Sequence, residues 1–254
     1  MQKPYIGITG FMSRSEVESI LEIMPTHAKR LLMVGVLVSW KTIRGIANKY
    51  PNRYPVPHKI AEIFPNNDSA LNLIHYNTDE KETLCEQLVA LTDSWGGMNL
   101  HGYQLNIAWP DPRAIEKYRH VFPDKQIVLQ IGKHAFQMID HSPEQLSAKV
   151  KEYDGLIHYV LLDPSGGHGE LLDVEKARQY LDALTETKMD IGLGVAGGLS
   201  PMTLNHIVPL IQDFPNLSID AEGRLRDTSD NLHISIALEY LDKFRYAFAL
   251  TSKV

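Results

Sequence analysis

Asp163 is the residue of this sequence best placed for acid–base chemistry. It ends the apolar run YVLLD and precedes the loop PSGGHG. A carboxyl group at the end of a buried strand is partly desolvated, so we expect its pKa to rise until it can donate a proton near neutral pH. Gly166, Gly167 and His168 would then line a binding loop beside it. The alternative is that Asp163 only caps backbone N–H groups of this glycine turn, with His168 at the surface.

A second candidate feature is the segment GVAGGLSP, which contains Gly197 and Gly198. Glycines let backbone N–H groups converge on an anion. Ser200-Pro201 has the pattern of a helix start, and the N-terminus of a helix there would favour negative charge. The segment therefore predicts a site for phosphate or another anionic group. The alternative is a tight turn between a strand and a helix, without a ligand.

The segment IDAEGRLR, which ends the next apolar run, carries charges of both signs. Asp220 is a further acid–base candidate, and Gly223 extends the anion-binding hypothesis. Glu222 opposes that hypothesis, because a negative charge about 5 Å from a phosphate is repelled by roughly 3 kcal/mol at an effective dielectric of about 20. Four resolutions stay open: Arg224 and Arg226 turn inward, Glu222 points away, the phosphate is bound differently, or the ligand carries no phosphate.

Other polar residues lie close to the expected strands and are weaker candidates. His75 and His101 are candidate bases, although His101 has the alternative of capping the entry of a strand. Lys41, Gln104 and Asn106 are candidate ligand contacts. In a barrel of parallel strands, the active site forms at the carboxyl ends, so these side chains should converge there.

A repeating pattern of strands and helices must position these residues. Eight short apolar runs alternate with amphipathic stretches that carry helix-start signals: Ser13 with Glu16, Asp111 before Pro112, Ser142 before Pro143, and Asp173. Continuous apolar strands are typical of sheets covered on both faces. The pattern predicts an α/β fold, a (β/α)₈ TIM barrel over residues 1–254 as a single domain, with a doubly wound open sheet as the alternative. The expected strands are Tyr5–Thr9, Leu32–Val38, Leu71–His75, Tyr103–Ala108, Ile127–Gln130, His158–Leu162, Ile191–Val195 and Leu217–Asp220.

A long loop at residues 39–57 follows the second expected strand. It is rich in Pro, Tyr, Asn and basic residues. A loop of this length inside a compact domain is more often functional than idle. A lid, an interface and a solvated excursion all remain open for it.

The composition excludes several classes of protein. The 254 residues are 44% hydrophobic and carry a formal net charge of -6, which leaves no electrostatic footprint for nucleic acid or an anionic membrane. The single cysteine, Cys85, excludes an internal disulfide, and no His, Asp and Glu spacing indicates a metal. The start MQKPYIGITG lacks a leader pattern. We expect a soluble, cytoplasmic protein that acts on a small molecule without metal or cofactor.

These segments together resemble the phosphoribosylanthranilate isomerase family, within the ribulose-phosphate-binding barrels. The resemblance rests on YIGIT, YVLLDPSGGHG and VAGGLSP in the first, sixth and seventh strands, with a fainter match of YQLN in the fourth. It implies a cofactor-free isomerase that converts a phosphoribosyl aminoaldose to an aminoketose with a cysteine base and an aspartate acid. Asp163 falls on the acid. Ile6 falls on the base, and isoleucine cannot take a proton.

The departure from the family pattern at Ile6 leads to three functional hypotheses. Loss of a positioned base typically costs 10²–10⁴-fold in rate. The first hypothesis is an isomerase of a small sugar-derived or sugar-phosphate substrate, in which Asp163 is a general acid/base and Asp220 or a histidine replaces the base. The second is a ligand-binding or regulatory barrel without catalysis. The third is a lyase or aldolase, which needs a desolvated lysine inside a strand, whereas Lys41 and Lys133 only follow strands.

Overall fold

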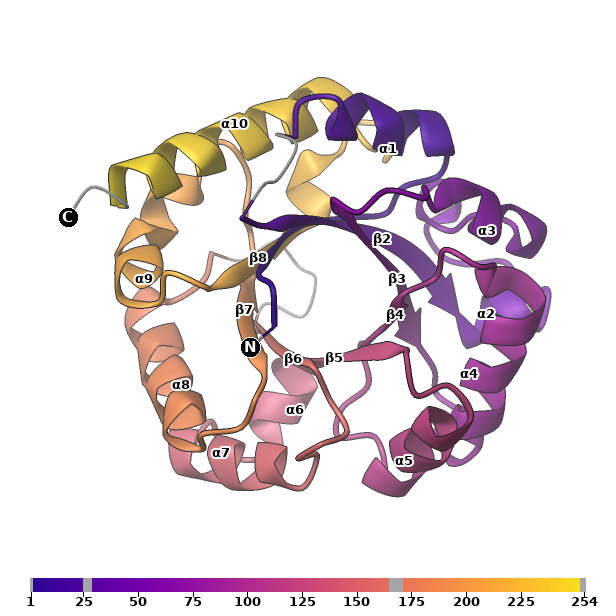
Figure 1. The fold of residues 1–254 in the computed structure, drawn as a ribbon, viewed down its shortest axis with the longest axis horizontal. Coiled ribbons are helices and arrows are strands. Elements are labelled where there is room, and N and C mark those ends of the chain that lie inside the picture. Colours follow the sequence, from indigo (N-terminus) through magenta and orange to yellow (C-terminus); the bar gives the residue numbers. More distant parts are fainter. Residues whose placement is uncertain (1, 25–28, 165–170, 252–254) are drawn as a thin grey trace.

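Eight parallel strands form a closed barrel in the computed structural model, which describes residues 2–24, 29–164 and 171–251. Each strand pairs with the next along the chain, and β8 closes the ring on β1, where Asp220 lies opposite Gly7. Figure 1 shows this ring at the centre and the helices around it. The closure confirms the (β/α)₈ barrel and excludes the doubly wound sheet. The strands are β1 (Tyr5–Thr9), β2 (Leu31–Ser39), β3 (Ala70–Asn77), β4 (Gly102–Leu105), β5 (Gln126–Gly132), β6 (Tyr159–Asp163), β7 (Gly192–Ala196) and β8 (Ser218–Ala221).

All eight expected strands are present, and the fourth differs most from its prediction. It was expected to reach Ala108 but ends at Leu105. The chain then bends, and Trp109 adopts a left-handed conformation with φ 47°. The apolar residues after the strand are partly or fully buried without continuing the ladder. These residues are apolar because they are buried, and the prediction mistook this apolar run for a longer strand.

The helices begin at several of the expected capping residues. Ser13 and Glu16 form the capping box of the first helix, and Asp111, Ser142 and Asp173 each cap a helix with a side-chain oxygen. The α-helices are α1 (Arg14–Leu21), α2 (Trp40–Ile43), α3 (Ile60–Ile63), α4 (Leu84–Leu91), α5 (Pro112–Val121), α6 (Lys133–Gln137), α7 (Pro143–Lys151), α8 (Val174–Glu186), α9 (Val208–Asp213) and α10 (Ile234–Thr251).

Ser200-Pro201 does not start a helix, contrary to the prediction. A turn follows, held by the Thr203 hydroxyl, which donates to the carbonyl of Gly198 at 2.8 Å. A short 3₁₀ helix, η5 (Leu204–Ile207), then leads into α9. The local side-chain hydrogen bonds favour a turn over a helix at this point. The glycines of residues 197 and 198 therefore gain no helix N-terminus at Ser200.

The segment of residues 39–57 is more ordered than the long loop expected there. It contains α2, the 3₁₀ helix η1 (Pro51–Arg53) and the first residue of η2 (Pro57–Lys59). Asn48 ties its first half together, because it donates to the Thr42 hydroxyl at 3.0 Å and accepts from the Ser39 hydroxyl at 2.6 Å. Its second half is held by contacts across the barrel mouth, described below.

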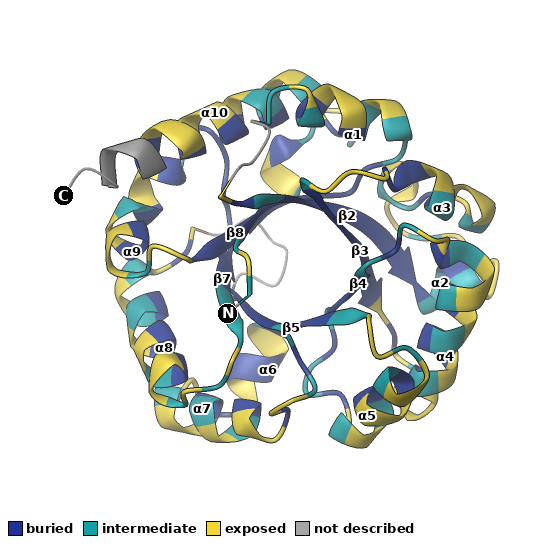
Figure 2. Ribbon diagram, viewed as in Figure 1, coloured by how far each residue is buried: buried dark blue, intermediate teal, exposed yellow. Residues whose placement is uncertain are grey.

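The core has two layers, one between barrel and helices and one inside the barrel. Figure 2 shows strands that are mostly buried and helices that bury only their inner sides. Ile6 and Ile8 belong to the outer layer, whereas Tyr5 packs inside the barrel with its ring centroid 5.2 Å from that of Tyr159. Residues of a strand alternate between faces. Positions 5, 7 and 9 of β1 therefore face the barrel interior.

Candidate active site

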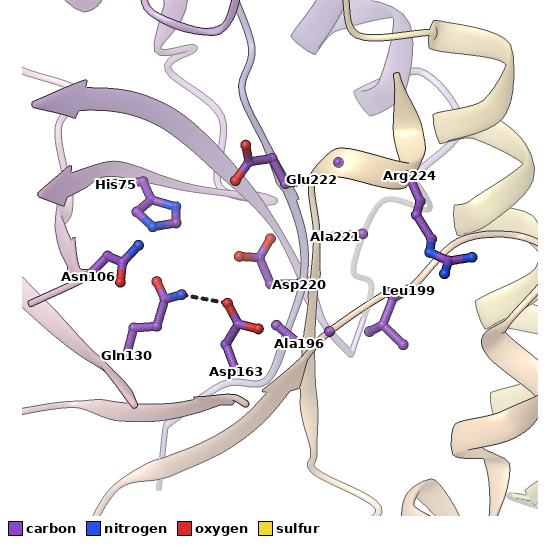
Figure 3. Close-up of a pocket in the computed structure, with 13 residues that line it drawn as sticks. His75, Asn106, Gln130, Asp163, Ala196, Leu199, Asp220, Ala221, Glu222 and Arg224 are labelled. Carbon is purple, nitrogen blue, oxygen red and sulfur yellow. Dashed lines mark hydrogen bonds between the residues drawn. The ribbon is translucent and has the colours of Figure 1, made fainter. Parts of the chain in front are cut away.

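A polar cavity opens at the carboxyl ends of β3 to β8, and we call it the cup (Figure 3). It measures about 60 Å³. The carboxyl groups of Asp163 and Asp220, the amide of Gln130 and the ring of His75 point toward a common centre. Convergence at this end of the barrel was predicted from the sequence. The cup is lined by His75, Asn106, Gln130, Asp163, Ala196, Gly197, Gly198, Leu199, Asp220, Ala221, Glu222, Gly223 and Arg224.

Two glutamines connect the two aspartates across the cup. Gln130 Nε2 donates to Asp163 Oδ2 at 2.9 Å, and Gln104 Nε2 donates to Gln130 Oε1 at 3.2 Å and to Asp220 Oδ2 at 3.1 Å. The Thr9 hydroxyl donates to Asp220 Oδ1 at 3.0 Å. All five side chains are buried. The amides hold both carboxyl groups in fixed positions, because each aspartate accepts a directed hydrogen bond.

Asp220 has the electrostatics of a proton-transfer group. Burial raises its pKa to about 7, against the hydrogen bonds from Gln104 and Thr9, which lower it. The nearby carboxylates of Glu222 and Asp163 raise it further. A carboxyl with a pKa near 7 can both accept and donate a proton at neutral pH. Such a pKa is found at Asp220, and the raised pKa expected at Asp163 stays a prediction.

Two polar atoms, one in the cup and one beneath it, have no hydrogen-bond partner in the part of the chain that the structure describes. They are His75 Nε2 and Gln104 Oε1, and both are buried. Burial lowers the pKa of His75 below its ordinary value, so the ring is neutral at pH 7. A buried polar atom without a partner is costly, on the order of 1–3 kcal/mol, and native proteins rarely leave one. His75 lines the cup, so its Nε2 is available to a ligand, whereas Gln104 lies beneath the cup.

The glycines Gly197, Gly198 and Gly223 line the cup together, as expected. Gly197 has φ 119° and Gly198 has φ 60°, conformations that favour glycine. Backbone N–H groups in such a turn can form a small anion-binding concavity. Because no helix starts at Ser200, the contribution of this turn to the anion hypothesis rests on its backbone geometry and not on a helix N-terminus.

Arg53 forms an ion pair with Glu222 and so offsets its negative charge beside the cup. Its Nη1 donates to Glu222 Oε1 at 2.8 Å, and its Nη2 lies 2.6 Å from Asp230 Oδ1. An inward turn of Arg224 and Arg226 was one of the open alternatives. Arg226 donates instead to the backbone carbonyls of Thr9 and Gly10, whereas Arg224 is among the residues that line the cup. Sequence reasoning missed Arg53 because 169 residues separate it from Glu222. Only the basic content of residues 39–57 hinted at it.

Two sequence candidates lie outside the cup. His101 precedes β4 at the amino end of the barrel, and its Nδ1 accepts the backbone N–H of Asn72 at 2.8 Å. The expectation that it reaches the mouth is therefore wrong, and its alternative as a cap at the strand entry is correct. Lys41 lies in α2, with its Nζ 5.9 Å from the ring centroid of Trp40. It is not among the described residues that line the cup.

Three further candidates, Gly166, Gly167 and His168, lie outside the described residues.

The two expected ligand contacts of the fourth strand region lie at different depths. Gln104 is fully buried beneath the cup, and Asn106 lines the cup itself.

Ile6 does not face the cup. It packs in the outer layer against the helices. The inward position beside it is Gly7, where an added Cβ would lie 2.6 Å from Asp220 Oδ1 and 2.7 Å from the Met33 side chain. The identity of residue 6 therefore does not decide whether this barrel has a base.

A larger groove adjoins the cup at the carboxyl ends of β3, β4 and β5. It measures about 370 Å³ and shares Asn106 with the cup. Lys81, Lys133 and His134 bring positive or titratable groups to its wall, and Asp79 brings a negative one. Lys133 is exposed at the start of α6, not inside a strand. This exposure disfavours the Schiff-base chemistry considered for it.

Within the described ranges, the chain shows neither a metal-binding cluster nor a membrane-spanning helix. No group of three or more His, Cys, Asp and Glu residues is arranged to hold a metal ion there. Among the described helices, none combines the length and apolar character needed to cross a bilayer.

The fold and the cup together define a (β/α)₈ barrel with the architecture of TIM-barrel enzymes. No protein-family model and no curated protein matches the sequence. Phosphoribosylanthranilate isomerase from Thermus thermophilus is similar in structure, with TM-score 0.63, 14% identity, and coverage of 95% of this chain and 98% of that chain.

Two further solved structures show the same similarity. TrpF from Jonesia denitrificans has TM-score 0.59 at 14% identity, covering 96% of this chain and 98% of that chain. Tryptophan synthase subunit alpha from Legionella pneumophila has TM-score 0.59 at 11% identity, covering 97% and 93%. The resemblance to phosphoribosylanthranilate isomerases is thus confirmed at the level of the fold.

Proposed function

We propose that this protein is an isomerase that shifts a carbonyl group within a small sugar-derived or sugar-phosphate substrate. The observation that carries the proposal is the pair Asp163 and Asp220, two buried carboxyl groups joined through Gln130 and Gln104 at the carboxyl end of the barrel. Such a shift needs one group to take a proton from carbon and another to give a proton to oxygen. The pair supplies both.

Asp220 serves as the base in this mechanism. With a pKa of about 7, it is ionised in about half of the molecules at neutral pH. It takes the proton from the carbon beside the carbonyl group, while Asp163 gives a proton to the carbonyl oxygen, as the family resemblance implies. Return of the proton to the neighbouring carbon and loss of the hydroxyl proton complete the isomerisation without net proton uptake. The neutral ring of His75 binds a substrate hydroxyl group through Nε2.

The size of the cup limits which part of the substrate it holds. A cavity of about 60 Å³ holds only a small part of such a substrate, since an enclosed cavity of about 150 Å³ binds a single benzene molecule. We place the anionic end of the substrate at Gly197 and Gly198. The remainder extends past Asn106 into the groove of about 370 Å³.

Proton exchange with D₂O tests the proposal directly. A panel of aldose and ketose phosphates and phosphoribosyl amino sugars is incubated with the protein, and deuterium at the carbon beside the carbonyl is followed by NMR. We expect exchange with at least one compound. Asp163→Asn and Asp220→Asn should each slow it by about 10²–10⁴-fold. Asp154→Asn, at an exposed position, is the matched control.

The ligand-binding alternative predicts another outcome. A compound at about 100 times its Kd should stabilise the fold by roughly 2.7 kcal/mol. Stabilisation by a sugar phosphate without any deuterium exchange would replace the isomerase by a binding barrel. Exchange that survives both aspartate substitutions would remove the proposed roles of Asp163 and Asp220.

A further inference from the structure

The segment after α2 is fastened to the far side of the barrel mouth. Asn52 donates to the backbone carbonyl of Ser229 at 2.9 Å, and Arg53 contacts Asp230 and Glu222. These bonds join residues separated by 169 to 177 positions in the sequence. The segment therefore places one guanidinium group beside the loop that follows β8.

The guanidinium of Arg53 divides its donors between two carboxylates. Its Nε donates to Asp230 at 2.9 Å and its Nη2 donates to Asp230 Oδ1 at 2.6 Å, a bidentate arrangement. Nη1 alone donates to Glu222, at 2.8 Å. The Tyr50 ring lies beneath, with its centroid 4.6 Å from the guanidinium carbon. Asp230 and Tyr50 therefore hold Arg53 in place without help from Glu222.

Glu222 belongs to this ion pair and to the cup at once. It lines the cup together with Gly197, Gly198 and Gly223. The side chains of Arg53 and Glu222 are 18% and 26% exposed, so the pair is only partly screened by solvent. An anionic group beside these glycines would be repelled by Glu222 and attracted by Arg53. The two side chains therefore act in opposite senses on such a group, and Arg224 also lines the cup.

We propose that Arg53 and Glu222 together determine which ligand charge the cup accepts. The Nη1 donor of Arg53 passes from Glu222 to the ligand when an anion binds. An anionic group that enters beside Gly197 and Gly198 takes the Nη1 donor of Arg53 from Glu222, while Asp230 keeps the guanidinium in position. In the absence of an anion, Glu222 occupies that donor. This inference rests on the proposed function only in placing the ligand in the cup, and it does not depend on turnover.

Binding of inorganic phosphate, measured by calorimetry at low ionic strength, tests the exchange. Glu222→Gln removes the competing charge and leaves Arg53 on Asp230, so phosphate should bind ten- to a hundred-fold more tightly. Arg53→Met leaves Glu222 without its cation and should weaken phosphate binding at least ten-fold. Glu80→Gln is the matched control, because Glu80 accepts from Arg44 of the same segment at 2.8 Å but does not line the cup. Its effect should stay within two-fold.

The gain of affinity is the decisive result, since a damaged fold does not bind more tightly. Unchanged or weaker phosphate binding by Glu222→Gln would overturn the exchange, as would wild-type binding by Arg53→Met. If Arg53→Met does not fold, the Glu222→Gln measurement decides alone. Deuterium exchange is scored separately. Tighter phosphate binding without any turnover keeps the charge selection and removes the isomerase, and turnover without tighter binding does the reverse.

Discussion

The two ends of this barrel both contain histidine, yet the rings are used differently. At the amino end, Nδ1 of His101 accepts the backbone N–H of Asn72 at 2.8 Å, and Nδ1 of His158 accepts that of Ile127 at 3.0 Å. At the carboxyl end, His75 Nε2 is buried without a hydrogen-bond partner among the described residues. The histidines at the amino end accept backbone N–H groups at the strand entries, whereas the histidine at the carboxyl end has a ring nitrogen, Nε2, without a partner among the described residues.

The two ends also differ in what their polar groups contribute to the stability of the fold. A ring that satisfies a backbone donor stabilises the barrel. A buried carboxyl with a raised pKa, such as Asp220, destabilises the folded state whenever it is ionised. The carboxyl end thus concentrates groups that are unfavourable for stability and suited to chemistry, as expected of the active face of a (β/α)₈ barrel. If this contrast is correct, substitutions at the two ends should have different effects on stability and turnover.

The largest expected effect concerns Asp220 and pH. Its pKa of about 7 in the folded state lies above its ordinary value of 3.8, so the folded chain holds an extra proton between these limits. Its contribution to stability is full below about pH 4 and is lost as the pH rises toward 7. In Asp220→Asn this loss is absent. The difference in unfolding free energy between wild type and variant should change by about 3 kcal/mol between about pH 4.5 and 7.5.

Denaturant unfolding at the two pH values measures this change, with Asp154→Asn as control. Parallel pH profiles of wild type and Asp220→Asn would show that Asp220 is ionised normally. The carboxyl end would then differ from the amino end in position but not in electrostatics.

An intermediate effect is expected at the amino end. His158→Ala leaves the N–H of Ile127 without its partner, which costs about 1–3 kcal/mol of unfolding free energy. Burial lowers the pKa of His158 to about 4. The wild-type ring is therefore neutral above its unfolded pKa of 6.5, and its stabilising contribution is lost as the pH falls from there toward 4.

Turnover separates this role from a catalytic one. Once folded, His158→Ala should exchange deuterium at the wild-type rate, and the acid-induced loss of stability should be smaller in the variant. A rate reduced more than about ten-fold at full folding would contradict the purely structural role of the amino end, since such a loss approaches that of a positioned acid–base group.

The smallest effect is expected at Ile6. Ile6→Cys removes apolar atoms from the layer beneath the helices, so the unfolding free energy should fall by about 1 kcal/mol. Because the new thiol faces away from the cup, deuterium exchange should stay within two-fold of wild type. A clear gain in rate would show that position 6 reaches the substrate and would overturn the outward placement.

The sequence alone was sufficient for the barrel and for much of the cup. Apolar runs and capping residues such as Ser13 and Asp173 are local signals, so all eight strands and several helix starts could be predicted. Asp163, Gly197 and Gly198 were found because they follow strands in a fold that gathers strand ends on one face.

Tertiary structure decided the charges, the facing of side chains and the remaining contacts. Arg53 reaches Glu222 across the barrel mouth, a pairing that no local pattern encodes. Position 6 faces outward and His101 lies at the amino end, because strand alternation and strand boundaries are fixed by the closed ladder. The pKa of Asp220 likewise depends on burial and on neighbours from other strands. Local patterns specify which elements form, and long-range packing specifies which side chains meet.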